Sequence, residues 1–263
     1  RYSFRSEPVA TPDVAGTTID FIYCIKNRVK RTTLSVESLA RSARKYAETG
    51  GRRITVRVTI VEDVSAAILD PDTMSFGFEL DHYIVDTGVR WTRSGLLNVG
   101  IMNSPSDLVA FVDSDFLFHE GYVQALDDYL SQTNWRAHVI ANNLIESETH
   151  DKTGLIYSEL SPYSFMWMAP TRAAQDVGGF DEGYEGHGYE DRDMELKLVK
   201  LAGLTVADTA SIVPECFVLY LSHNQRDGYD KHEVNRDRYR QREAFARPSQ
   251  LLQDRWGEQD ILW

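Results

Sequence analysis

Two aspartates one residue apart, Asp113 and Asp115, directly follow an apolar run from 108 to 112. A run of this length and composition predicts a buried strand, and residues i and i+2 of an extended segment lie on the same face. The two carboxylates repel each other unless a cation lies between them. Oxygen ligands of this kind suit a hard divalent ion such as Mg²⁺ or Mn²⁺. By itself an Asp-x-Asp pair more often marks a turn after a strand, where Asp and Ser are common.

A second acidic pair and a histidine suggest what such an ion would do. Glu190 and Asp191 follow a glycine-rich segment and precede an apolar helical pattern, and His223 follows a late apolar run. Acidic residues in a first helical turn complement the helix dipole, which is a sufficient structural reason for them. A carboxylate at a dry helix start also suits a general base. If Asp115 and His223 bind a metal ion, these residues together indicate a transfer reaction in which a metal-bound diphosphate is the leaving group.

Charge and composition limit the possible partners. Lys26, Arg28 and Arg93 lie near predicted strand ends, where a diphosphate would need local positive charge. The chain has 263 residues, 42% of them hydrophobic, and a net charge of -12, so it can form a core and nucleic acid is excluded as a partner. No apolar run reaches the ~20 residues of a membrane span. Cys24 and Cys216 both lie in apolar runs, which favours two free thiols over a disulfide.

The predicted elements alternate along the chain and indicate an α/β fold with a mainly parallel central sheet flanked by helices. In such sheets, ligands bind beyond the carboxyl ends of the strands, and charged clusters occur at three such ends, 26–28, 62–63 and 113–115. A long polar connection is expected between 142 and 161, and the charged helix near the C-terminus either packs on the body or is solvated. Strands are predicted at 17–25, 54–60, 82–85, 108–112, 137–141, 165–169 and 216–221, and helices at 33–47, 94–102, 121–130, 194–201 and 231–247.

Four motifs resemble the β-1,4-galactosyltransferases and the galactosyltransferase-type domains of bacterial chondroitin-polymerase-like enzymes. The segment 91–100 (WTRSGLLNVG) resembles the one that precedes the family's Asp-x-Asp motif, here 113–115. Gly178-Gly179-Phe180-Asp181 with 186–193 (GHGYEDRD) resembles the family's Gly-Phe and Trp-Gly-Gly-Glu-Asp-Asp region. The segment 222–227 (SHNQRD) is similar to its His-Ser-Arg-Asp stretch. The motifs occur in the family's order between about residues 22 and 240.

The resemblance implies a GT-A fold and an inverting, Mn²⁺- or Mg²⁺-dependent transfer of a hexose or N-acetylhexosamine from a UDP-sugar to a hydroxyl of a glycan or other acceptor. By position, Asp115 and His223 would bind the metal, with Asp113 beside it. Asp191 would be the base, and Glu190 would orient the acceptor. Donor binding is assigned to Lys26, Arg28, Asp63, Trp91, Arg93, Asp113 and Ser114, and the acceptor-side lid to Gly186, His187, Gly188 and Tyr189.

The sequence departs from the family at three positions. His187 replaces a tryptophan, Tyr220 replaces a methionine ligand, and Lys26 replaces an arginine. The first two changes keep open an alternative, a catalytically inactive carbohydrate- or nucleotide-binding module of the same fold. A metal-dependent nucleotidyltransferase is a third hypothesis, but no glycine-rich phosphate loop occurs near the first strand.

We expect a lead-in segment at 1–16, a single GT-A glycosyltransferase domain at 17–247 and a C-terminal tail at 248–263. The expected compartment is the bacterial cytoplasm, because no membrane anchor is visible in the sequence; the alternative is an excised lumenal catalytic domain.

Overall fold

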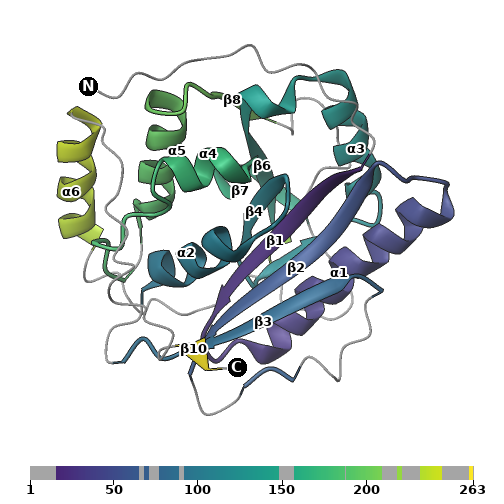
Figure 1. The fold of residues 1–263 in the computed structure, drawn as a ribbon, viewed down its shortest axis with the longest axis horizontal. Helices are drawn as coiled ribbons and strands as arrows, with labels where there is room; N and C mark the ends of the chain where they lie inside the picture. The colour runs from purple at the N-terminus through teal and green to yellow at the C-terminus, as the bar shows by residue number, and fades with distance from the viewer. Residues whose placement is uncertain are drawn as a thin grey trace.

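The computed structural model describes residues 16–64, 68–70, 77–88, 92–147, 157–186, 188–208, 218–220, 232–244 and 261–262. The described strands form one sheet, in the order β10-β3-β2-β1-β4-β7-β6-β9-β5, with β8 also paired to β6 (Figure 1). The strands are β1 (Thr17–Ile25), β2 (Ile54–Asp63), β3 (Glu79–Val85), β4 (Leu108–Val112), β5 (Phe116–Phe118), β6 (His138–Ser147), β7 (Tyr157–Pro170), β8 (Thr205–Asp208), β9 (Val218–Tyr220) and β10 (Ile261–Leu262). The helices are α1 (Val29–Glu48), α2 (Arg93–Asn103), α3 (Tyr122–Gln132), α4 (Thr171–Asp176), α5 (Glu190–Lys200) and α6 (His232–Ala244), with a short 3-10 helix, η2 (Trp135–Ala137).

The first half of the sheet is parallel. Strands β3, β2, β1 and β4 run in the same direction as neighbours, with Ile25 paired to Glu62 and Tyr23 paired to Val112. Strand β7 is antiparallel to β4, and the remainder of the sheet is mixed. This α/β architecture, with a mostly parallel centre, confirms the predicted fold class. The register places the carboxyl ends of β1, β2 and β4 at one edge of the sheet.

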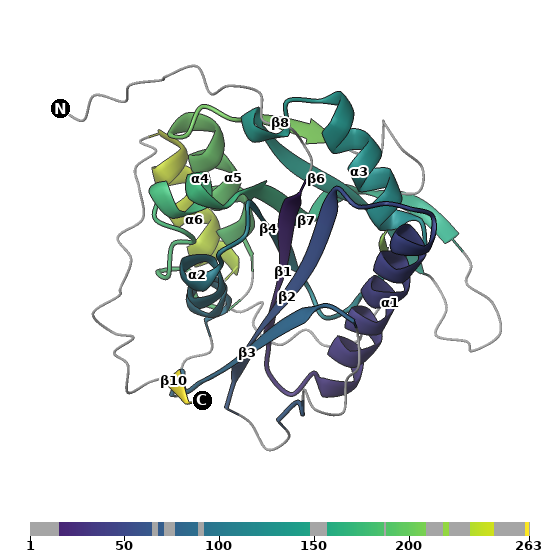
Figure 2. The same cartoon turned by 45° about the vertical axis from the view of Figure 1, so that its right-hand side comes forward.

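Helices cover both faces of the sheet, with α1 and α3 on one side and α2, α4 and α5 on the other (Figure 2). Alternate side chains of β1 pack against the helices on the two faces of the sheet, since successive residues of a strand point to opposite faces. Phe21 and Tyr23 belong to the core under α1 and α3, whereas Ile22 and Cys24 belong to the core under α2 and α5. The buried strands carry apolar residues on both faces, as expected for a parallel sheet covered on both sides.

Helix α2 approaches β1 so closely that a glycine is required at the contact. A Cβ added at Gly100 would lie 2.5 Å from Cγ2 of Ile22. We expect Gly100→Ala to lower the free energy of unfolding by about 1–2 kcal/mol, because overpacking outweighs the gain in helix propensity. Urea denaturation measures this loss. In an Ile22→Ala background the same change should cost less, and equal costs in the two backgrounds would contradict the proposed contact.

Several elements differ from expectation: β5, α4 and β8 were not predicted, and α1, β6 and β7 are longer than predicted. Helix α1 begins at Val29, one turn before the predicted stripe at 33–47. The prediction of a polar connection over 142–161 is wrong at both ends of that range, because β6 continues to Ser147 and β7 begins at Tyr157. These polar stretches pair with each other in an antiparallel ladder with register shifts, so backbone hydrogen bonds stabilise them without an apolar alternation in the sequence.

Two further elements, α6 and β10, contact the rest of the protein. Helix α6, expected either to pack or to be solvated, packs beside α5 and buries Asn235 and Arg242. Within the segment expected as a tail, β10 pairs antiparallel with β3.

Candidate active site

Several of the predicted site residues lie together at the carboxyl edge of the parallel strands. Lys26 follows β1, Asp63 is the last residue of β2, and Asp113 follows β4. Because β1 lies between β2 and β4 in the sheet, the three strand ends are neighbours. This is the edge at which α/β proteins of this class bind ligands.

Asp115 is a buried carboxylate held by two arginines of α1. Its side chain is 8% exposed, and its Oδ1 lies 2.6 Å from a guanidinium nitrogen of Arg31 and 3.4 Å from one of Arg28. Both arginines occur at the start of α1, where residues i and i+3 lie on one helix face. Ser114, between the two aspartates, is also buried. The strand end therefore combines carboxylate oxygens with nearby guanidinium groups.

Arg93 joins the strand-end aspartates to the acidic start of α5. Its guanidinium lies 2.9 Å from Oδ1 of Asp113 and 3.4 Å from Oε1 of Glu190. Burial alone would lower the pKa of Arg93, but the carboxylates of Asp113, Glu190 and Asp191 together raise it above its ordinary value. The arginine thus stays charged and brings together two acidic motifs that lie far apart in the sequence.

Lys26 and Asp63 form an ion pair between the ends of β1 and β2. Asp63 is held in place from the other side, because its Oδ1 accepts hydrogen bonds from the backbone N–H of Thr87 at 3.0 Å and from the Thr87 hydroxyl at 2.8 Å. The segment after β3 thereby fixes a carboxylate next to a lysine. This lysine is about one-third exposed and accessible to an anionic ligand.

Helix α5 starts sharply after a glycine-rich loop. Gly186 and Gly188 have φ of +70° and +103°, and Tyr189, which precedes the helix, has φ of +73°. A left-handed tyrosine is uncommon and is maintained only where surrounding contacts hold it. Glu190 is buried, whereas Asp191 is half-buried and accepts a hydrogen bond from the Arg192 backbone N–H at 2.8 Å. The Asp191 carboxylate therefore lies at a helix N-terminus with access to solvent.

Two residues near this site were not predicted from the sequence. Arg31 was missed because its proximity to Asp115 depends on the early start of α1; its spacing of three from Arg28 is the signal that could have identified it. Cys24 is a free, buried thiol whose pKa burial raises to about 12, close to the charges of Arg93, Asp113 and Glu190. Cys24 is therefore an uncharged, buried residue next to the site. Cys216 lies outside the described residues.

Three predicted site residues, Trp91, His187 and His223, also lie outside the described residues. The strand that precedes His223 is described, and its register places Tyr220 opposite Phe116, the residue after Asp115.

The carboxylates at the end of β4 are suitable ligands for a hard divalent ion, but they form only part of a site. Asp113 and Asp115 offer carboxylate oxygens, which Mg²⁺ and Mn²⁺ prefer. Within the described ranges, no group of three His, Cys, Asp or Glu side chains is arranged to hold a metal ion. Likewise, none of the helices in those ranges is long and apolar enough to cross a membrane.

The sequence matches no known family profile and no curated protein. Solved structures do match the fold. The catalytic domain of Drosophila β1,4-galactosyltransferase 7 in complex with xylobiose aligns with a TM-score of 0.54 at 13% identity, over 85% of this chain and 79% of that one. A mutant of the fly enzyme, in complex with manganese, UDP-Gal and xylobiose, aligns with a TM-score of 0.50 at 13% identity, over 84% and 79% of the two chains.

A bacterial protein aligns equally well. Staphylococcus aureus TarS 1–349 in complex with UDP-GlcNAc gives a TM-score of 0.58 at 15% identity, over 80% of this chain. This chain spans about 60% of that TarS chain. At such identities the likeness concerns the fold alone. The chain therefore has the GT-A fold found in UDP-sugar glycosyltransferases.

Proposed function

We propose that this protein is an inverting, metal-dependent glycosyltransferase that moves a hexose or N-acetylhexosamine from a UDP-sugar to a hydroxyl of a glycan or other acceptor. The observation that carries the proposal is the double contact of Arg93 with Asp113 and Glu190. It joins the strand-end acidic pair to the acidic start of α5 on a GT-A fold. A donor group and an acceptor base need this proximity, since transfer occurs only between groups held in contact.

The donor side is assigned to the cations at the strand ends. Arg28, Arg31 and Arg93 pair with carboxylates, and Lys26 pairs with Asp63. Guanidinium groups suit a diphosphate because they form paired hydrogen bonds with its oxygens. An acidic protein thus offers positive charge where a UDP moiety would bind. Ser114 and Trp91 complete the proposed donor set.

The proposed metal ligands are Asp115, Asp113 and His223. The register of β9 supports the third ligand, because it places Tyr220, three residues before His223, opposite the residue that follows Asp115. When bound, a divalent ion supplies positive charge that stabilises the departing diphosphate.

The acceptor side is assigned to α5 and the loop before it. Asp191 accepts the proton of the acceptor hydroxyl, while the acceptor oxygen forms a bond to the anomeric carbon and the bond from that carbon to the diphosphate oxygen breaks. One displacement of this kind inverts the anomeric centre. Glu190, held by Arg93, orients the acceptor, and Gly186, His187, Gly188 and Tyr189 form the acceptor-side lid.

The direct test is UDP release over a panel of UDP-sugars that begins with UDP-Gal and UDP-GlcNAc, with and without Mn²⁺. We expect acceptor-dependent release that EDTA abolishes, and calorimetry should show UDP binding that strengthens when Mn²⁺ is added. Asp115→Asn should lose UDP release and metal-dependent UDP binding. Asp237→Asn, an exposed change on α6, should retain both activities. Metal-dependent binding without turnover on any donor would identify a binding module instead, and absence of both would contradict the proposal.

A further inference from the structure

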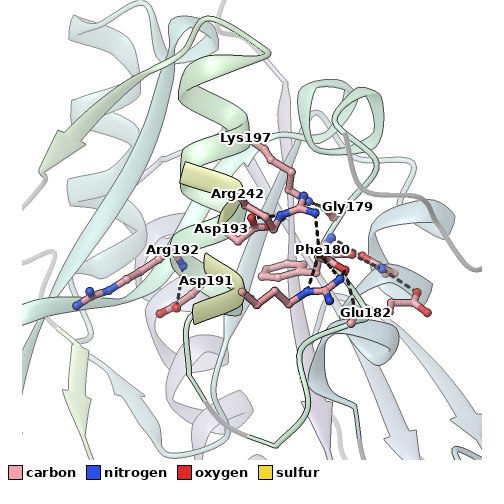
Figure 3. Close-up of polar contacts among 12 residues, drawn as sticks. Gly179, Phe180, Glu182, Asp191, Arg192, Asp193, Lys197 and Arg242 are labelled. Atoms are coloured by element: carbon pink, nitrogen blue, oxygen red, sulfur yellow. Dashed lines mark hydrogen bonds and ion pairs between the residues drawn. The ribbon is translucent and has the colours of Figure 1, made fainter. Parts of the chain in front are cut away.

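Helix α6 is joined to the acceptor side by a network of ion pairs. Arg238 donates to both carboxylate oxygens of Asp181, at 2.9 Å to Oδ1 and 3.2 Å to Oδ2 from different nitrogens. Arg242 lies 2.7 Å from Oδ2 of Asp181 and also pairs with Asp193. Figure 3 shows Arg242, Asp193 and Lys197 directed toward one another, with Asp191 pointing away from them. The two arginines of α6 thus hold carboxylates before and within the start of α5.

Lys197 completes the network from inside α5. Its side chain is fully buried, lies 3.6 Å from Asp193 and donates a hydrogen bond to the Gly179 carbonyl oxygen. Burial lowers the pKa of Lys197 to about 8, although Asp193 opposes that shift. Burial alone would raise the pKa of Asp181, but the Gly183 amide and the two arginines lower it below its ordinary value. The network therefore connects both ends of the segment that carries Glu190 and Asp191.

A second set of contacts joins α6 to the residues on either side of position 187. The Asn235 side chain donates to the Glu185 carbonyl oxygen at 2.8 Å and accepts from the Glu185 backbone N–H at 3.3 Å. The ring of Tyr189 lies 5.1 Å from that of His232 and 5.6 Å from that of Tyr239, between centroids. The left-handed backbone of Tyr189, immediately before Glu190, is thus supported by aromatic contacts with α6.

Arg238 also lies against the loop that precedes α5. A Cβ added at Gly183 would lie 2.1 Å from a guanidinium nitrogen of Arg238, so the end of that side chain would have to move to accommodate it. On the donor side, Lys26 pairs with Asp63 and Arg28 and Arg31 pair with Asp115, whereas Arg93 pairs with both Asp113 and Glu190. Helix α6 therefore contacts the acceptor side directly, and Arg93 links that side to the donor side.

We propose, on the basis of the glycosyltransferase function above, that α6 positions the acceptor side of the site. Arg238, Asn235 and Tyr239 are positioning residues: they hold the loop and Tyr189, and through them the location of Asp191 relative to the donor. A positioning role predicts a selective defect, because displacement of the base and loop by even a fraction of an ångström weakens acceptor alignment and leaves donor contacts unchanged.

The test compares Arg238→Gln and Tyr239→Leu with Arg240→Ala, a matched change of an exposed arginine on the same helix. Arg238 is about two-fifths exposed but pairs with the buried Asp181, so the melting temperature of each variant is measured alongside its kinetics. We expect Arg238→Gln to raise the acceptor KM about tenfold, because a displacement of the acceptor-side loop by a fraction of an ångström weakens acceptor alignment, with donor KM unchanged. Arg238→Lys should give an intermediate acceptor KM, and Arg240→Ala should match the wild type.

The outcomes separate the two proposals. If the wild type transfers sugar and Arg238→Gln matches Arg240→Ala, or changes donor and acceptor KM in proportion, the positioning role of α6 is overturned while the glycosyltransferase proposal stands. A melting temperature lowered without any change in acceptor KM would show that Arg238 acts on stability alone, which also overturns it. A wild type that transfers no sugar to any acceptor removes both proposals together.

Discussion

Asp191→Asn is expected to lower kcat for sugar transfer by about 10²–10⁴-fold, the contribution typical of a general base. The amide keeps the shape of the side chain and its hydrogen bond from the Arg192 backbone N–H, so helix α5 should start as before. The change removes only the group that accepts the proton. Steady-state kinetics of UDP release, with calorimetry of UDP binding in Mn²⁺, measures the two effects separately.

Binding of UDP should be unchanged in Asp191→Asn, because the donor-side contacts of Arg93 are with Asp113 and Glu190. Asp176→Asn, which removes one partner of a surface ion pair with Arg172 on α4, is the control and should retain full activity. Retained transfer in Asp191→Asn would refute its assignment as base. If Glu190→Gln then showed the larger loss in kcat with UDP binding preserved, the base would be Glu190.

Asp193→Asn is expected to lower the free energy of unfolding by about 3–5 kcal/mol, the cost of leaving a buried charge without its partner. Asp193 is fully buried, and its carboxylate lies 3.6 Å from the Lys197 ammonium group. The amide cannot compensate the ammonium group, and it also loses the ion pair with Arg242. Urea denaturation followed by circular dichroism measures the loss.

A double-mutant cycle distinguishes this explanation from a general loss of packing. Lys197→Met replaces the ammonium by an apolar side chain of similar length, so the double variant should recover part of the stability lost in Asp193→Asn. Asp237→Asn, on the exposed side of α6, should change stability by less than about 0.5 kcal/mol. Additive effects of the two single substitutions would show that Asp193 and Lys197 are not energetically coupled.

The α/β class could be predicted because apolar periodicity records local structure. Strand β4 is buried on both faces and appears as a continuous apolar run, whereas β2 alternates apolar with polar residues along its first half. The strand-end charges at Lys26, Asp63 and Asp113 were predictable for the same reason, since parallel strands place their carboxyl ends at one edge. The polar halves of β6 and β7 were not predictable, because their strands pair with each other and no apolar pattern in the sequence records that pairing.

The ion-pair network between α5 and α6 could not be predicted from the sequence either. Asp193 lies two residues after Asp191 in the same acidic stretch, yet the structure separates their roles: Asp193 is fully buried in ion pairs, whereas Asp191 is half-buried and points away. A helical rotation of about 100° per residue places these two side chains on nearly opposite faces. Which face meets α6 is a matter of packing, and no local pattern records it.

The amino-acid sequence by itself determined the order of elements, the acidic and basic strand ends and the ordered motifs, because burial periodicity and residue chemistry are local properties. Only the tertiary structure decided that Arg93 joins Asp113 to Glu190, that Arg31 reaches Asp115 and that α6 holds the start of α5. Each of these contacts joins separate elements, and its existence depends on how sheet and helices pack.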